Sequence, residues 1–193
     1  MAILIEGYSV VINKSLAMQN ADALSALKSV DETLHPLAIC SDETLLRVGF
    51  LDLKQAQEFL NELEKAGVKV PNKEGEASNV EAVMVTQFGE IETPCSWLGV
   101  QFTKLKDHTL ICLGSLKEGG NVAPVKGVAF PKGWDKERSI LKRYHDERIH
   151  YMHEHYDFVR SEPMHDIFRH RETQREVRLL KLNYVEPDQA QLQ

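Results

Sequence analysis

The chain has 193 residues, of which 42% are hydrophobic, and a formal net charge of −6. At this length a folded chain buries about 70% of the surface that its unfolded form exposes, so a core can form without disulfides or a structural metal. The negative charge repels phosphate backbones, which disfavours nucleic acid as a partner.

The N-terminus and the cysteines predict a cytoplasmic protein. The apolar run that begins at Met1 has no basic flank, meets Glu6 at once and is too short for a signal peptide or a membrane span, so we expect no membrane partner. The three cysteines are far apart, with no CxxC pair and no spacing that suits a zinc ribbon. Unpaired cysteines are typical of a reducing compartment.

The first 40 residues predict two strands and a helix. Residues 2–13 place β-branched and apolar side chains on both faces, which predicts one strand buried near the centre of a sheet. Residues 20–30 predict a short helix. A residue before proline favours extended geometry, so Pro36 predicts a second short strand over 37–40.

Residues 45–67 carry the clearest local signal. A strand over 45–51 is followed by Asp52 as helix N-cap, and Gln55 occupies the position that completes a capping box. An apolar stripe then continues along the predicted helix, and Gly67 stands where a left-handed C-terminal cap is needed. This segment predicts a strand followed directly by a helix.

Three more strands are predicted after a polar loop. Residues 70–79 contain proline and glycine among polar side chains and predict an exposed loop. The strands are expected over 80–88, 96–102 and 108–115, and the turn-rich joints between them favour antiparallel pairing. A helix followed by consecutive strands of this kind is typical of an α+β fold.

The sequence as a whole therefore predicts an α+β protein with a mostly antiparallel sheet, two short-to-medium helices and a long C-terminal amphipathic helix. We expect an α+β domain over 1–133 and a C-terminal helical extension with a frayed tail over 134–193. The division follows a change in composition, because six of the eight histidines and eight of the nine arginines lie in the second part.

Two resemblances accompany this pattern. The segments EGYSVVI, LLRVGF and TPCSWLGVQF look like parts of an uncharacterised bacterial protein family, which implies one continuous bacterial domain over about 3–115 and no particular activity. The predicted order βαβββ over about 44–115 also resembles the units of the glyoxalase/dioxygenase-like superfamily. That resemblance implies metal ligands near the strand ends, where this sequence offers only Glu43 and His108.

A cysteine and a histidine form a weak catalytic candidate. Cys95 follows a proline beside a predicted turn, and a nucleophilic thiol needs a nearby base such as His108. The sequence lacks a nucleophile elbow and the local signatures of cysteine proteases. A small apolar residue at a strand start is the simpler interpretation of Cys95.

Residues 134–160 form the longest run without glycine or proline and predict one continuous helix. Its apolar residues occupy a broad half of the wheel at about 100° per residue, and they include Tyr151, Met152, Tyr156 and Phe158. His155 falls among them and His145 at their margin. We therefore expect this half to pack on the sheet.

The other half of this predicted helix carries a candidate metal site. Asp146, His150, His153 and Asp157 are spaced i, i+4, i+7 and i+11 and form one stripe. Imidazole and carboxylate are suitable ligands for a divalent transition metal, although no cofactor is required by any motif. The simpler alternative is a solvated face whose side chains support the helix by pairing with each other.

Beyond residue 160 the sequence predicts a break at Pro163 and a strand over 177–184. The arginines and histidines of this C-terminal third suit a protein partner or self-association, or else a helix face with internal ion pairs. We expect a bacterial binding or protein-interaction module, regulatory or immunity-type in character. The alternative is a metal-dependent hydrolase or lyase that uses the Asp/His/His/Asp face, so the sequence leaves open whether the protein is an enzyme.

Overall fold

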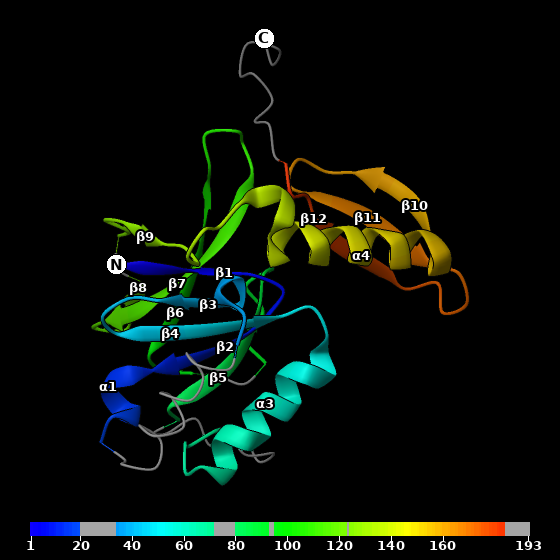
Figure 1. Ribbon diagram of the computed structural model, residues 1–193. Coiled ribbons are helices and arrows are strands. Elements are labelled where there is room, and N and C mark those ends of the chain that lie inside the picture. The colour runs from blue at the N-terminus through cyan, green and yellow to red at the C-terminus, as the bar shows by residue number, and fades with distance from the viewer. Residues whose placement is uncertain (20–33, 72–79, 93–94, 123, 184–193) are drawn as a thin grey trace.

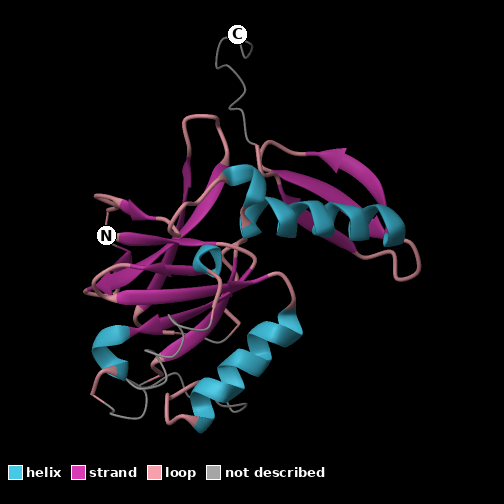
Figure 2. Ribbon diagram, in the orientation of Figure 1, coloured by secondary structure: helices cyan, strands magenta, loops and turns pink. Residues whose placement is uncertain are grey.

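The computed structural model describes residues 1–19, 34–71, 80–92, 95–122 and 124–183 (Figure 1). It is α+β, with mostly antiparallel sheets and few helices, as the sequence predicts (Figure 2). The helix predicted over 20–30 and most of the loop predicted over 70–79 lie outside the described residues. No helix among the described residues is long and apolar enough to span a membrane.

Two sheets and one helix form a layered body. In the first sheet the strand order is β6-β7-β1-β9, with β8 paired to the far end of β7, and in the second it is β3-β4-β2-β5. The strands of the first sheet are β1 (Ala2–Ile5), β6 (Leu98–Lys104), β7 (Leu110–Glu118), β8 (Asn121–Val122) and β9 (Val128–Ala129). Those of the second are β2 (Tyr8–Asn13), β3 (Ile39–Ser41), β4 (Leu45–Phe50) and β5 (Ala82–Thr86).

The prediction of a single strand over 2–13 is wrong, because the chain passes from one sheet to the other at Gly7. Gly7 has a φ of +56°, which ends β1 and starts β2 in a new direction. A Cβ atom at Gly7 would lie 2.3 Å from the carbonyl oxygen of Phe50. The apolar residues of this segment are therefore buried in two strands of two different sheets, not in one central strand.

Side chains of the second sheet alternate between two apolar layers. Val11 of β2 and Leu45 of β4 point to the layer between the two sheets, which also contains β1 and β7. Val10 and Val48 point to the other face, where the helix α3 (Leu53–Lys65) packs with Ala56. The second sheet is thus buried on both faces, and this explains the near-continuous apolar runs of its strands.

The strand-helix unit predicted over 45–67 is confirmed. Asp52 caps α3 by accepting a hydrogen bond from the backbone N–H of Gln55 at 3.1 Å. Gly67 follows the helix with a φ of +86°, the left-handed conformation predicted for it. The three strands predicted after the loop are also present, as β5, β6 and β7.

The helix predicted over 134–160 is shorter in the structure. A 3₁₀ turn (η2, Lys136–Arg138) capped by Asp135 comes first, and the helix α4 (Ile140–His155) begins after Ser139, whose hydroxyl accepts from the N–H of Lys142. Tyr156 then starts a strand, so the chain beyond α4 is not helical. The described residues therefore do not show the long C-terminal helix that was predicted.

A third antiparallel sheet follows α4, in the order β10-β11-β12. Its strands are β10 (Tyr156–Ser161), β11 (His165–His170) and β12 (Glu176–Leu180). Met152 of α4, Phe168 of β11 and Leu179 of β12 form a separate small core. We call α4 and these three strands the C-terminal unit. The strand predicted over 177–184 is present as β12, although it begins and ends earlier.

Candidate functional site

The structure does not bring the four predicted metal ligands together. Asp146 pairs with Lys142, His150 lies 3.3 Å from Glu154 with its side chain 79% exposed, and Asp157 lies 3.0 Å from Arg171. Asp157 belongs to β10 and not to the helix, so the i+11 spacing does not place it on the same helix face as Asp146. Among the described residues, no group of three or more His, Cys, Asp or Glu side chains could hold a metal ion.

Cys95 and His108 lie at opposite ends of a hairpin. Cys95 precedes β6 and is buried, whereas His108 is exposed in the turn that joins β6 to β7. Seven residues of strand β6 separate the two ends, a distance of about 20 Å at ~3.4 Å per residue. The structure therefore does not place this imidazole where it could accept the proton of the Cys95 thiol.

Native cysteines are expected to react slowly with an alkylating reagent. Burial raises the pKa of the Cys95 and Cys40 thiols, and it raises that of Cys112 to about 12, which lowers the fraction of reactive thiolate at neutral pH. Mass spectrometry of iodoacetamide-treated protein should show slow labelling of all three until the chain is unfolded. Fast, selective labelling of native Cys95 would contradict this and favour cysteine chemistry.

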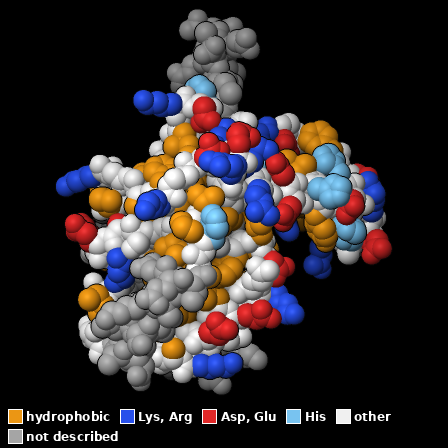
Figure 3. Space-filling model, viewed as in Figure 1, with side chains coloured by type: hydrophobic (Ala, Val, Ile, Leu, Met, Phe, Trp, Pro, Cys, Tyr) orange, Lys and Arg blue, Asp and Glu red, His pale blue; other side chains and the backbone are white. Residues whose placement is uncertain are grey.

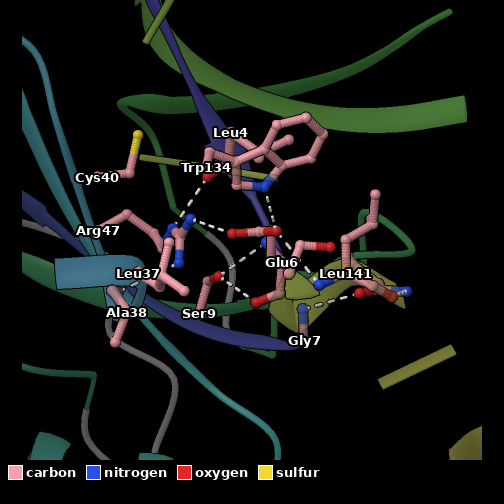
Figure 4. A network of polar contacts seen from close by, with 12 residues as sticks. Leu4, Glu6, Gly7, Ser9, Leu37, Ala38, Cys40, Arg47, Trp134 and Leu141 are labelled. Carbon is pink, nitrogen blue, oxygen red and sulfur yellow. Dashed lines mark hydrogen bonds and ion pairs between the residues drawn. The ribbon is translucent and has the colours of Figure 1, made fainter. Parts of the chain in front are cut away.

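A buried ion pair joins the two sheets to the start of α4 (Figure 4). Arg47 points from β4 into the layer between the sheets, and its guanidinium lies 2.7 Å from the Glu6 carboxylate at the end of β1, with both side chains fully buried. Arg47 also donates to the carbonyl oxygens of Leu4 and Ala38 at 3.0 and 3.2 Å. These two buried charges are therefore paired with each other, and Arg47 is also hydrogen-bonded to backbone carbonyls, as a buried ion pair requires.

The same carboxylate holds the C-terminal part of the chain. Glu6 Oε1 accepts from the indole N–H of Trp134 at 2.8 Å and from the backbone N–H of Leu141 at 3.2 Å (Figure 4). Gln87 adds a bridge, because it accepts from the N–H of Gly7 and donates to the carbonyl of Leu141. The first turn of α4 is thereby fixed to the point where the chain changes sheets.

This attachment creates a cleft of about 350 Å³ where the C-terminal unit meets the body. Tyr8 of β2 and Phe88 line it from the body, and Tyr144 of α4 lies between them at ring-centroid distances of 5.1 and 5.8 Å. Arg148 of α4 and Arg178 of β12 line it from the C-terminal unit. We call this feature the α4 cleft. Its residues come from segments far apart in the sequence, which no local pattern connects.

A second feature is a group of rings at the far end of α4. Tyr151 contacts His155 and Tyr156 at ring-centroid distances of 4.5 and 6.2 Å, and Tyr156 contacts His170 at 4.7 Å. Phe158 follows Tyr156 by two residues on β10; it is 55% exposed and its ring contacts that of Phe168 at a centroid distance of 5.7 Å. We call five of these residues the ring cluster: Tyr151, His155, Tyr156, Phe158 and His170. Figure 3 shows histidine side chains beside hydrophobic ones over this end of the molecule.

The ring cluster corrects the predicted packing face of the helix. Tyr151 and His155 were expected to pack on the sheet, but 44% of Tyr151 is exposed and half of the His155 side chain. Leu141, Tyr144 and Met152, which also belong to the predicted packing half, are buried as expected. Tyr156 and Phe158 were expected on the same helix face, but they belong to the strand β10.

Comparison with protein-family models, with curated proteins and with solved structures found no match.

Proposed function

We propose that this protein is a binding module that contacts another protein molecule through the ring cluster of its C-terminal unit. The observation that carries the proposal is the exposure of Tyr151 and Phe158 at one end of the molecule. Aromatic side chains offer a large contact area at a small cost in side-chain entropy, and they are enriched at the centres of protein interfaces.

The surroundings of the ring cluster resemble the rim of an interface. Arg171 pairs with Asp157, and its guanidinium also donates to backbone carbonyls at the end of α4. Arg160 pairs with Glu162 and with Glu176 on the face of the third sheet. Interfaces commonly place apolar rings at the centre and hydrated charged groups around them, and exposed pairs of this kind contribute little to the stability of the fold itself.

We propose that the partner contacts the side chains of the ring cluster and does not pair as an added strand with the edge of the third sheet. β10 is the edge strand of its sheet, and edge strands can pair with another chain. However, the register of β10 shifts between Phe158 and Arg160, and Asp157 and Arg160 place charges along the strand. Irregular and charged edges oppose pairing, which leaves the rings as the contact surface.

The proposal predicts that replacing two exposed rings with serine weakens association. In the variant Tyr151→Ser/Phe158→Ser, affinity should fall by roughly tenfold or more, because a single hot-spot ring typically contributes ~2 kcal/mol and about 1.4 kcal/mol is already tenfold. Sedimentation velocity measures self-association, and quantitative capture from host extract identifies any other protein bound by the wild type. Tyr151 also contacts His155, and Phe158 contacts Phe168, so the melting temperature of the variant is measured alongside to establish that it stays folded.

Met18→Ser is the matched control, because Met18 is 60% exposed at the end of the short helix α1 (Lys14–Ala17) in the two-sheet body. It removes one exposed apolar side chain far from the ring cluster along the chain. The proposal is supported if association falls in the ring variant and not in Met18→Ser. A wild-type chain that is monomeric and captures nothing, or equal association in all three proteins, would refute it.

A further inference from the structure

We propose that the α4 cleft binds a small aromatic anion, a planar ring that carries a carboxylate or a phosphate. None of the residues that line this cleft belongs to the ring cluster, although the lining residue Arg148 also contacts the Tyr151 ring of that cluster. The volume of about 350 Å³ lies near the lower end of ligand sites. It suits one ring with its charged group rather than a larger cofactor.

The aromatic wall of the cleft can bind a ring. Tyr144 meets both Tyr8 and Phe88 edge-on or tilted, and it is itself only 6% exposed. These three rings therefore hold one another in place before any ligand arrives. Phe102 of β6, which is 39% exposed, adds a further apolar surface at the cleft. A preformed aromatic wall favours a planar apolar group, because little side-chain entropy is lost on binding.

The cations of the cleft can bind an anion. Within the part of the chain that the structure describes, no carboxylate lies at ion-pair distance from Arg148, whose guanidinium carbon lies 5.8 Å from the centre of the Tyr151 ring. Arg178 has one carboxylate neighbour, Glu162, at the long distance of 4.0 Å. Guanidinium groups bind carboxylate and phosphate through two parallel hydrogen bonds, so these arginines have donors to spare.

The balance of charge around the cleft also favours an anion. Arg148 and Arg178 face a single lining carboxylate, Glu90, and His165 adds a further nitrogen donor or acceptor from β11. The chain as a whole has a net charge of −6, so the two arginines at this cleft run against its overall balance of charge. A cationic ligand would be repelled by these two guanidinium groups, and a neutral ring would leave their spare hydrogen-bond donors unused.

Tyr144 supplies a polar group beside the aromatic wall. Burial, and then its interaction with the Tyr8 hydroxyl, raise the pKa of Tyr144, so its hydroxyl stays protonated at physiological pH. A neutral phenol can donate a hydrogen bond and does not repel an anion.

Isothermal titration calorimetry with four probes tests the proposal. Benzoate and phenyl phosphate carry both the ring and the charge, benzamide carries the ring alone, and inorganic phosphate carries the charge alone. We expect at least one of the two aromatic anions to bind at least about tenfold more tightly than benzamide and inorganic phosphate, since each bidentate charged contact typically exceeds that difference. Which aromatic anion binds more tightly identifies the charged group that the cleft prefers.

Variants locate the binding to the cleft. Arg148→Gln/Arg178→Gln should weaken the better aromatic anion by about tenfold or more, and both side chains are exposed, so the fold should be retained. Arg143→Gln is the matched control, because Arg143 is also exposed on α4 but does not line the cleft. Failure of both aromatic anions to bind, equal binding of benzamide, or unchanged affinity in the double variant would each overturn the proposal.

Discussion

Arg47→Met is expected to lower the free energy of unfolding by about 3–5 kcal/mol, the largest effect of any substitution considered for this chain. The change leaves the Glu6 carboxylate fully buried between two sheets without its charged partner. The carbonyl oxygens of Leu4 and Ala38 also lose their side-chain donor. Chemical denaturation followed by circular dichroism measures the loss.

The second partner provides a way to separate charge from packing. In the double variant Glu6→Gln/Arg47→Met both charges are removed, and the glutamine oxygen can still accept from Trp134 and from the N–H of Leu141. Replacing both members of a buried pair often costs much less than removing one, so the double variant should recover a large part of the loss. A double variant that is less stable than Arg47→Met would show that the pair acts through shape rather than charge.

Arg160→Met is the matched control for Arg47→Met. Arg160 also pairs with carboxylates, at 3.1 and 3.2 Å, but its side chain is 48% exposed. Exposed ion pairs contribute roughly 0–1 kcal/mol, so this variant should stay close to the wild type. If Arg47→Met and Arg160→Met unfold at the same denaturant concentration, the buried Glu6–Arg47 pair contributes no more to the free energy of unfolding than an exposed pair does.

Gly7→Ala is expected to cost about 2–4 kcal/mol, from backbone strain and overpacking together. Its φ of +56° is unfavourable for alanine, and the added Cβ would lie 2.3 Å from the carbonyl oxygen of Phe50 and 2.8 Å from a methyl group of Ile140. Ile140 begins α4, so the substitution should also loosen the attachment of that helix. Thermal unfolding and hydrogen exchange of α4 amides measure the two effects.

Gly119→Ala separates strain from overpacking. Gly119 has a similar φ of +58°, but a Cβ there would meet nothing within 4 Å. Only the left-handed conformation is penalised at this position, at about 1–2 kcal/mol. We expect Gly7→Ala to lower the free energy of unfolding clearly more than Gly119→Ala does. Equal decreases in the two variants would mean that the backbone near Phe50 moves to accommodate the added Cβ atom at little cost.

Local signals in the sequence predicted the local structure. Asp52 and Gly67 mark the ends of α3 because capping depends on residues within a few positions of each other. The sequence predicts one helix over 134–160 because that stretch has no glycine or proline, whereas in the structure Asp135 caps a separate 3₁₀ turn and Ser139 caps α4. The strand β10 depends on pairing with β11, which the helix periodicity does not reveal.

Contacts between distant segments could not be predicted. Arg47 is the one arginine before residue 134. Nothing in the sequence identified Glu6 as its partner, because the two are 41 positions apart. The α4 cleft combines residues from Tyr8 to Leu180 and is produced by tertiary packing alone. The predicted division at residue 133 stays a prediction.

Site-specific photo-crosslinking at position 158 tests whether the ring cluster contacts another protein molecule. The proposed function places Phe158 at the contact with another protein molecule, so p-benzoylphenylalanine introduced there should give a discrete crosslinked species in host cells, identified as a second copy or another protein by mass spectrometry. The same group at position 54 on α3, where Lys54 is also exposed, should give none. No crosslink at position 158, or the same products from both positions, would contradict the proposal that the ring cluster is the binding surface.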